Sequence, residues 1–376
     1  MRFDADVIVV GGGVMGSAAA WQATRRGLSV VLLERFEPGH THGASHGAAR
    51  NFNTAYATDD YLRLVLEARR LWDDLAEQSG TVLLDLVGLV NHGHVPTLRD
   101  TAEALDHHGI AHHVLPARAA AERWAGLRFR TDVLHVPQAG RVRAADALHA
   151  FRAAATTADF RYRTPVREIR TDGGTALAVT DTGELRAPRG IVTAGAWTRA
   201  LVPPDVPLPR MVVTQEQPAH FAPVADGLDW PSFNHTPDPG EPGDDYWYSP
   251  VYGMLTPGEG VKAGWHGVGP RTDPDHRTHR PEPVQLAALQ RYVAEWVPGV
   301  DPATAAPISC TYTSTDDTDF VLDRAGAWAV GAGFSGHGFK FAPAIGRTLV
   351  DLAHGVVAPS RFHAARAAAG TAPGLR

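Results

Sequence analysis

A glycine-rich turn near the N-terminus is the first feature that could do chemistry. Residues 6–10 form a short apolar strand pattern, and Gly11, Gly13 and Gly16 follow it in a G-x-G-x-x-G spacing. Glu34 closes a second apolar run, 18 residues after Gly16. Glycines at this spacing let the backbone approach a pyrophosphate at a helix N-terminus, and an acid at this distance can accept hydrogen bonds from a ribose hydroxyl. The pattern predicts a dinucleotide site.

Lysine is scarce in this chain, and the two that occur are candidates for chemistry. Of the 35 basic residues, only Lys262 and Lys340 are lysine. An arginine fork cannot replace a compact ammonium that must fit a tight site or change its protonation state. The two lysines are therefore either functional residues or chance survivors at tolerant positions, and composition alone favours neither reading.

The single cysteine, Cys310, excludes an intrachain disulfide and a cysteine-cluster metal site. The residue is either a buried thiol that packs as a small hydrophobe or a reactive group. Three histidines, His40, His42 and His46, are close together in the sequence. They lack a nearby carboxylate or cysteine to complete a ligand set, so we expect no metal site.

A second glycine-dense segment, residues 331–340, leads into a helical pattern at residues 341–353. His337 and Lys340 belong to this loop. The N-terminus of the helix would face whatever the loop wraps, and its partial positive charge would favour an anion there.

These motifs together resemble the family of monomeric sarcosine oxidase and N-methyltryptophan oxidase, within the FAD enzymes related to D-amino-acid oxidase. The likeness spans nearly the whole chain. It is carried by GGGVMGS at 11–17, by Ser45-His46-Gly47 with Arg50 and Ala55-Tyr56, by VKAGWH around Lys262, by CTYTSTD from Cys310, and by GFSGHGFKF at 333–341.

The resemblance implies an FAD enzyme in which Cys310 bonds covalently to the flavin through a thioether. It also implies that Lys262 lies over the flavin and promotes the reaction of the reduced cofactor with O2. Physical chemistry supports that role, because a preorganised ammonium in a dry site stabilises the negative charge that O2 gains far better than it would in water. A solvated surface lysine is the alternative.

Further roles follow from the same resemblance. Lys340 is expected to meet a substrate carboxylate, and Arg50 to lie near the flavin, where it stabilises the reduced form or orients the amine. For His337 substrate contact and a structural hydrogen bond are both open, and for Arg50 a helix cap or a salt bridge is the alternative. The implied cofactor-binding set is Gly11, Gly13, Val14, Met15, Gly16, Glu34, Arg35, Ser45, His46, Arg50, Cys310, Gly336, Gly338, Phe339 and Lys340.

Two positions depart from the family pattern and bear on the substrate. Sarcosine oxidases carry a second arginine three residues after the one matched by Arg50, and it shares the substrate carboxylate; this chain has Asn53. Losing a bidentate guanidinium removes about 1.5 to 3 kcal/mol of charged hydrogen bonding. Trp247 stands about where the family has a tyrosine lining the cavity. We expect a substrate pocket reshaped toward a bulkier or less acidic amine than sarcosine, with Asn53, Trp247, His337 and Lys340 in its wall.

The elements that must position these residues follow from hydrophobic periodicity and turn residues. Residues 217–245, rich in Pro, Gly and Asp, predict an irregular insertion, and the residues after about Ser360 predict a frayed tail. Helices are expected at 17–26, 59–78, 284–296 and 341–353, and strands at 6–10, 28–33, 186–193, 308–313, 320–322 and 328–330.

Length and composition limit the classes of protein that remain. The 376 residues exceed the roughly 250 to 300 at which a single core stops growing. The formal charge of −6 lacks the basic excess that a nucleic-acid partner requires. The sequence has neither an apolar run of about 20 residues nor a signal-peptide pattern. We expect no nucleic-acid or membrane partner and a cytoplasmic location.

The predicted fold class is mixed α/β (α+β). A Rossmann-like FAD-binding domain is expected from residues 1–80, 140–207 and 307–376. A second, sheet-rich substrate domain is expected from residues 81–139 and 208–306.

The predicted function is FAD-dependent oxidation of the C–N bond of a secondary or cyclic amine or imino acid to an imine, with O2 reduced to H2O2, in a monomer. Two alternatives stay open. A flavin monooxygenase would share the glycine pattern and Glu34 but would use a reduced nicotinamide. A catalytically silent relative that binds flavin or an amine is compatible with Asn53.

Overall fold

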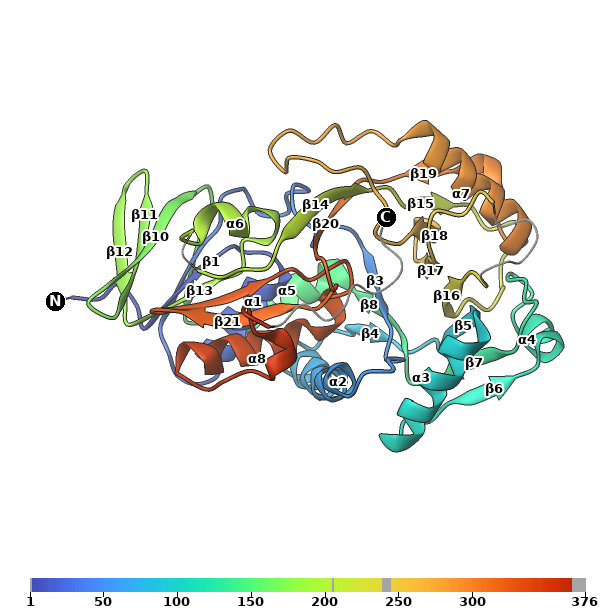
Figure 1. Cartoon of the computed structure of the whole chain (residues 1–376), viewed down its shortest axis with the longest axis horizontal. Coiled ribbons are helices and arrows are strands. Elements are labelled where there is room, and N and C mark those ends of the chain that lie inside the picture. Colours follow the sequence, from blue (N-terminus) through green and yellow to red (C-terminus); the bar gives the residue numbers. More distant parts are fainter. Residues whose placement is uncertain (1, 205, 239–244, 367–376) are drawn as a thin grey trace.

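A mostly parallel sheet of six strands forms one half of the molecule, on the left of Figure 1. The computed structural model describes residues 2–204, 206–238 and 245–366. All neighbours in the sheet pair in parallel except β21 and β22, which are antiparallel and form one edge of the sheet. The strand order is β21 (Val321–Ala325), β22 (Trp328–Ala332), β13 (Arg189–Val192), β1 (Val7–Val10), β2 (Val30–Leu33) and β9 (Ala158–Arg161).

Helices cover one face of this sheet, and a small antiparallel sheet covers the other. The central strands are apolar throughout and fully buried, as strands packed on both faces must be. The helices are α1 (Val14–Thr24), α2 (Asp59–Ser79), α5 (Ala144–Ala154) and α8 (Ala342–Ala353). The opposite layer holds β10 (Val166–Asp172), β11 (Thr175–Thr180), β12 (Gly183–Ala187), η1 (Gly195–Trp197) and α6 (Thr198–Leu201).

A second sheet of eight strands forms the other half, on the right of Figure 1. Its neighbours are antiparallel except for β16 and β5, which run parallel. The order is β19 (Ala306–Pro307), β15 (Ala219–Phe221), β18 (Gly260–Trp265), β17 (Val251–Thr256), β16 (Ser232–Thr236), β5 (Leu89–Gly93), β7 (Val133–Val136) and β6 (His113–Leu115). The remaining helices are α3 (Val95–His107), α4 (Ala117–Arg123), α7 (Pro283–Trp296), η2 (Pro302–Thr304), η3 (Phe339–Phe341) and η4 (Ser360–Phe362).

Two short sheets lie between the halves. In one, β14 (Met211–Glu216) pairs antiparallel with β20 (Cys310–Thr315), so that Glu216 stands opposite Cys310. In the other, β8 (Gly140–Arg143) lies between β3 (Ala49–Phe52) and β4 (Leu84–Asp85). These strands place Cys310 and Arg50 at the boundary between the two large sheets.

The fold class is the predicted one, with a parallel FAD-binding type of sheet and a separate, mostly antiparallel sheet. The helices predicted at 59–78, 284–296 and 341–353 correspond closely to α2, α7 and α8. The strands of the two large sheets come from several separated segments of the chain. The assignment of those segments to two domains with the stated boundaries stays a prediction.

Two local predictions are wrong. Residues 217–245 are not an irregular insertion, because they contribute β15 and β16 to the eight-stranded sheet; residues 239–244 lie outside the described part. The described part of the expected tail is not frayed either. Phe362 is buried, Arg361 pairs with Asp60 and Asp319, and Arg366 pairs with Asp317. Residues 367–376 fall outside the described ranges.

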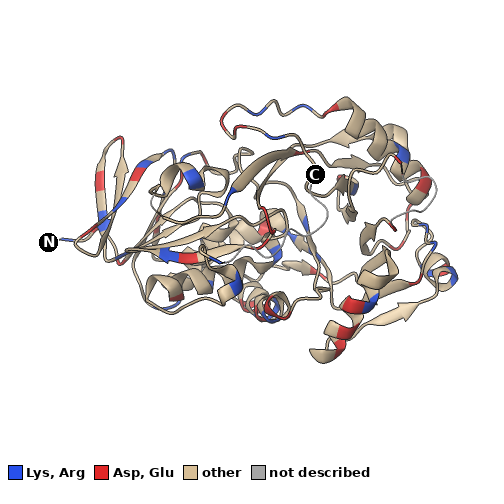
Figure 2. Ribbon diagram, viewed as in Figure 1, with Lys and Arg blue, Asp and Glu red and all other residues tan. Residues whose placement is uncertain are grey.

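Charge is distributed unevenly over the eight-stranded sheet (Figure 2). Strands β5, β16 and β17 contain no acidic or basic residue other than histidine, whereas α3 carries Arg99, Asp100, Glu103 and Asp106. Across the residues that the structure describes, no helix is long and apolar enough to span a membrane.

Candidate active site

The glycine turn lies between β1 and α1 and is held by contacts too close for any side chain. Gly11 has a φ of +100°, and a Cβ there would stand 2.5 Å from the carbonyl oxygen of Thr193. Gly13 is the N-cap of α1 and has no Cβ to obstruct an anion at the helix N-terminus. Gly16 is on the inner side of the turn, where a Cβ would collide with the Gly11 carbonyl, and it does not line the cavity.

Glu34 fixes the same turn through its carboxylate. The backbone N–H of Gly12 donates to Oε2 at 2.7 Å, and that of Phe36 donates to Oε1 at 2.8 Å. Both oxygens keep a free lone pair that a ribose hydroxyl could use. The next residue, Arg35, forms a salt bridge to Asp275 at 2.8 Å and lies over the ring of Trp197. Arg152, which sequence analysis missed, donates to the Gly12 carbonyl at 3.1 Å.

One cavity of about 1200 Å³ runs from this turn to the eight-stranded sheet. Its wall includes Val14 and Met15 at the start of α1 and Gly336, Gly338 and Phe339 in the loop before α8. Gly336 has a φ of +77°, and a Cβ there would lie 2.0 Å from the ring of Tyr312. A glycine is therefore required where this loop passes Tyr312. The cavity joins both glycine-rich motifs, which are more than 300 residues apart in the sequence.

The loop before β3 lies beside Cys310, and Ser45, His46 and, from β3 itself, Arg50 hold it in place. The backbone N–H of Val14 donates to Ser45 Oγ at 3.0 Å, which ties the loop to the N-terminus of α1. His46 Nε2 lies 3.0 Å from the Ser309 carbonyl, and burial lowers the pKa of its imidazole. Arg50 donates to the carbonyls of Ala49, Ala44 and His46.

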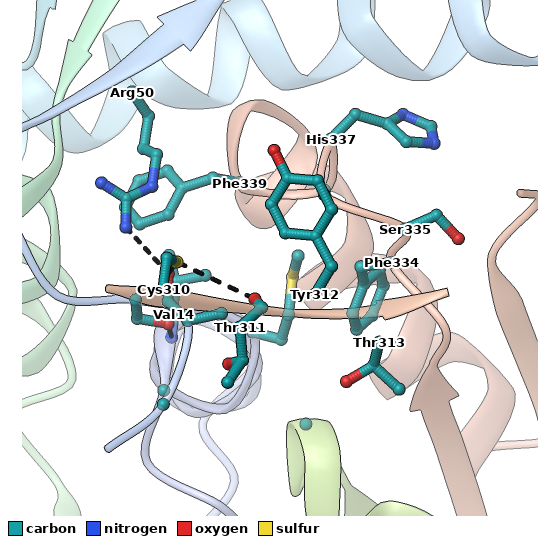
Figure 3. A pocket seen from close by; sticks show the side chains of 18 of the residues that line it. Val14, Arg50, Cys310, Thr311, Tyr312, Thr313, Phe334, Ser335, His337 and Phe339 are labelled. Atoms are coloured by element: carbon teal, nitrogen blue, oxygen red, sulfur yellow. Dashed lines mark hydrogen bonds between the residues drawn. The ribbon is translucent and has the colours of Figure 1, made fainter. Parts of the chain in front are cut away.

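Cys310 begins β20 and lines the cavity, half-buried. Its Sγ lies 3.9 Å from the Ala44 carbonyl oxygen. Figure 3 shows the Arg50 guanidinium beside the ring of Phe339, with its centre 5.6 Å from the ring centroid, on the side of the strand where Cys310 lies. The thiol is thus open to a ligand in the cavity and is not packed away as a core side chain.

Lys262 is buried in the cavity wall without a carboxylate partner. Its side chain is 4% exposed, and Nζ donates to the Ala49 carbonyl at 2.8 Å. In the described part of the chain it forms no salt bridge. Burial, reinforced by the charge of Arg50, lowers the pKa of Lys262 to about 7. The ammonium is therefore destabilised in the free protein and would be stabilised by any negative charge that develops nearby.

Lys340 is the second buried lysine of the cavity, and it lies in a hydrogen-bonded group with Tyr56 and His337. The bonds of His337 assign its tautomer. Nζ of Lys340 donates to Tyr56 Oη and to the His337 carbonyl, both at 2.9 Å. His337 Nε2 lies 3.2 Å from the Thr318 carbonyl and must donate to it, so Nδ1 accepts from Tyr56 Oη at 3.3 Å. Both ring nitrogens of His337 are occupied, which favours the structural reading of this residue.

Burial changes the protonation of this group as well. It lowers the pKa of Lys340 to about 7 and holds the pKa of His337 well below its ordinary value. Lys340 has no carboxylate within salt-bridge distance among the described residues. The lysine is therefore available to an anionic or polar group of a ligand.

Asn53 lines the cavity, as expected, and its amide is partly used by the backbone. Oδ1 accepts from the N–H of Ala55 at 2.7 Å. This bond leaves the side-chain NH2 and one lone pair of Oδ1 free to meet a ligand. The side chain thus offers a neutral donor where the family pattern has a guanidinium.

The placement of Trp247 in the substrate pocket needs correction. Trp247 packs into an aromatic cluster behind the eight-stranded sheet, 4.8 Å from His235 and 5.1 Å from Tyr292 between ring centroids, and is not part of the cavity wall. Tyr252, on β17 and five residues further along the chain, does line the cavity. The loop before β17 carries no periodicity from which the orientation of Trp247 could be read.

Two further residues of the wall had a signal in the sequence that was overlooked. His266 follows Lys262 by four residues and Tyr312 follows Cys310 by two, and even spacing along a strand places side chains on one face. Tyr312 Oη lies 3.4 Å from His266 Nδ1, and both side chains line the cavity. Burial lowers the pKa of His266 to about 4, so its imidazole is neutral near pH 7.

Comparison with known proteins places this geometry in a family. The model of the FAD dependent oxidoreductase family matches residues 6–352. The chain is 30% identical over 366 residues to monomeric sarcosine oxidase of Bacillus sp. (strain NS-129), covering 93% of this chain and 92% of that one. It is 29% identical to N-methyl-L-tryptophan oxidase of Yersinia pestis (strain Pestoides F), covering 96% and 99%.

Among solved structures, the open form of NikD, an unusual amino acid oxidase essential for nikkomycin biosynthesis, superimposes with a TM-score of 0.84 at 27% identity. The alignment covers 96% of this chain and 98% of NikD. Because the family model spans nearly the whole chain, from β1 to α8, the protein belongs to the FAD dependent oxidoreductase family, in the group of sarcosine and amino acid oxidases.

Proposed function

We propose that this protein is an FAD-dependent oxidase that converts the C–N bond of a secondary or cyclic amine, or of an imino acid, into an imine and reduces O2 to H2O2. The carrying observation is that the only two lysines and the only cysteine of the chain line the cavity that begins at the glycine turn. Chance survival of lysines at tolerant surface positions would not bury both in one cavity.

The residues present fit an elongated dinucleotide such as FAD. The glycine turn and the N-terminus of α1 would hold the pyrophosphate, and Glu34 would take a ribose hydroxyl with its free lone pairs. Cys310 would bond to the isoalloxazine as a thioether. When bound, FAD supplies the redox chemistry by accepting a hydride from the amine carbon and passing two electrons to O2.

Lys262 supports the oxygen half of the reaction. Its Nζ is fixed by the Ala49 carbonyl in a nearly dry site, where a positive charge acts with little screening. An ammonium placed there stabilises charge that appears only as O2 is reduced, so its effect is concentrated on that step.

Lys340 supports binding and orientation of the amine. Tyr56 and the His337 carbonyl direct its Nζ, and His337 keeps Tyr56 in place through Nδ1. In this arrangement His337 is a positioning residue. Asn53 contributes neutral hydrogen-bonding groups and no charge, which favours amines other than sarcosine.

Peroxide release tests the proposal. The purified yellow protein is incubated with N-methyl amino acids, cyclic imino acids and neutral secondary amines, without NAD(P)H, and H2O2 is measured. Peroxide formed with at least one amine supports an oxidase and argues against a monooxygenase. Bound flavin that no amine reduces under anaerobic conditions would instead favour a silent family member. The monomeric state and the cytoplasmic location stay predictions.

A further inference from the structure

The asparagines of this chain have an unusual distribution. Only four occur in 376 residues, and all four line the cavity: Asn51, Asn53, Asn91 and Asn234. Asn53 closes a local turn, because its Oδ1 accepts from the backbone N–H of Ala55. The place of Asn51, Asn91 and Asn234 in the cavity points to a ligand and not to local backbone structure.

Sheet register explains how two of them come together. Asn91 on β5, Asn234 on β16 and Tyr252 on β17 are direct neighbours across three adjacent strands. Met254 and Lys262 pair in the same register one step along β17 and β18. One face of the eight-stranded sheet thus forms the cavity wall, with Lys262 at one side and Asn91 at the other.

Three of the asparagines form a ladder of side-chain amides. Asn51 Nδ2 donates to Asn234 Oδ1 at 3.2 Å, and Asn234 Nδ2 donates to Asn91 Oδ1 at 2.8 Å. Asn234 thus accepts from Asn51 and donates to Asn91, and its amide keeps one further N–H and one further lone pair. Asn51 Oδ1 and Asn91 Nδ2 are enclosed by protein atoms and have no hydrogen-bond partner among the described residues. If all three amides are turned over, the two ends exchange roles, so the ladder always ends in one donor and one acceptor.

On the eight-stranded sheet the surroundings of the ladder are polar but uncharged, and at its Asn51 end Arg141 stands opposite on β8, paired with Asp85. The cavity-lining residues that β5, β16 and β17 contribute include no ionised side chain, as Figure 2 indicates for these strands. The nearby residues of α3 that line the cavity are Thr97, Leu98 and Thr101. A carboxylate or ammonium beside Asn91 would meet no ionised side chain of these strands, and an apolar group would leave the remaining N–H and lone pair of Asn234 unpaired.

We propose that Asn51, Asn234 and Asn91 form a subsite for an uncharged substituent of the amine substrate that both donates and accepts hydrogen bonds, for which a carboxamide is the best match. This inference rests on the proposed function and narrows its substrate class. A site built from buried polar groups discriminates strongly against analogues that cannot hydrogen-bond, because its own groups are then left unpaired.

Matched substrates of equal length test the subsite. N-methylglutamine, N-methylglutamate and N-methylnorleucine, each as both enantiomers, are compared by kcat/KM for peroxide release and by the Kd from the change in flavin absorbance. We expect the carboxamide to exceed the charged and the apolar analogue by about tenfold or more. Asn91→Leu should reduce the ratio of carboxamide to apolar analogue to about threefold or less. Met254→Leu, on the same sheet face, should keep it.

The outcomes separate this inference from the proposed function. Oxidation of N-methylnorleucine as efficiently as N-methylglutamine overturns the subsite but leaves an amine oxidase. If no amine reduces the flavin, the proposed function fails, and the Kd values still decide whether the carboxamide is preferred. Should Asn91→Leu fail to bind flavin or to unfold cooperatively, Asn51→Leu at the other end of the ladder replaces it. An unchanged ratio in a folded variant refutes the subsite.

Discussion

The two ends of the cavity are built on different principles. At the glycine turn, the charged group Glu34 is satisfied by backbone N–H donors within 22 residues of it. At the other end, Lys262 and Lys340 are buried with only neutral oxygen acceptors. At one end the charge is held by backbone donors, whereas the other end keeps positive charge that lacks a charged partner.

This difference teaches where selectivity resides. A turn whose polar groups already bond one another can hold a constant part of a ligand, and nothing in it needs to change with the substrate. Unpaired buried cations cost free energy until charge appears beside them, so they mark the end at which bonds are made and broken. Changes at the lysine end should therefore alter chemistry and specificity, and changes at the turn should alter cofactor retention.

The largest expected effect concerns the proposed covalent bond between Cys310 and the flavin, at the lysine end of the cavity. In the wild type, flavin should stay with the polypeptide after acid precipitation, because a thioether survives unfolding and hydrogen bonds do not. Cys310→Ser should move all of it to the supernatant, while the glycine turn still binds FAD in the native protein. Absorbance of pellet and supernatant measures this. Wild-type flavin found wholly in the supernatant would show that Cys310 makes no such bond.

The next effect separates the two lysines. Lys262→Met should slow reoxidation of the reduced enzyme by O2 by roughly 100-fold or more, and change anaerobic reduction by substrate much less, since the ammonium acts on charge that arises only with O2. Lys340→Met, the matched control, should mainly weaken substrate binding. Stopped-flow spectroscopy resolves both half-reactions. Equal slowing of both half-reactions in Lys262→Met contradicts the division of roles.

The glycine turn and the lysine end of the cavity also differ in how much of each could be predicted from the sequence. The glycine turn and Glu34 were recognisable because their spacing is local and fixed by backbone geometry. The ladder of amides was not, because Asn234 meets Asn91 across 143 residues through a parallel pairing of β16 with β5. The Pro- and Gly-rich sequence around β16 concealed that strand. The prediction that Trp247 lines the substrate pocket was also wrong, because its side chain packs behind the sheet while Tyr252 faces the cavity.

A third prediction asks whether specificity has changed at Asn53. Asn53→Arg should raise kcat/KM for sarcosine by roughly tenfold, because a charged hydrogen bond can supply about 1.4 kcal/mol. Trp247 lies outside the cavity and does not obstruct the new side chain, so the single substitution suffices. Asn53→Gln, which stays neutral, should give no gain. Wild-type turnover of sarcosine as fast as that of its best amine would remove the basis for this prediction.

The smallest effect is a pH dependence at Lys340. Because burial lowers its pKa to about 7, the free protein carries the ammonium below pH 7 and loses it as the pH rises. A carboxylate ligand binds the charged form, so its affinity should be constant well below pH 7 and fall above it. From pH 7 to pH 8 the charged fraction drops from about one half to about one tenth, which gives a roughly fivefold weaker affinity.

Lys262 is the main competing explanation of such a pH profile, because burial lowers its pKa to about 7 as well. The groups around Lys340 do not titrate in this range: burial lowers the pKa of His266 to about 4, holds the pKa of His337 well below its ordinary value, and raises that of Tyr56. A non-oxidisable carboxylate with a thioether in place of the amine is titrated against the flavin absorbance. The fivefold change should persist in Lys262→Met and vanish in Lys340→Met. The opposite pattern would assign the carboxylate to Lys262 and remove the distinction between the two lysines.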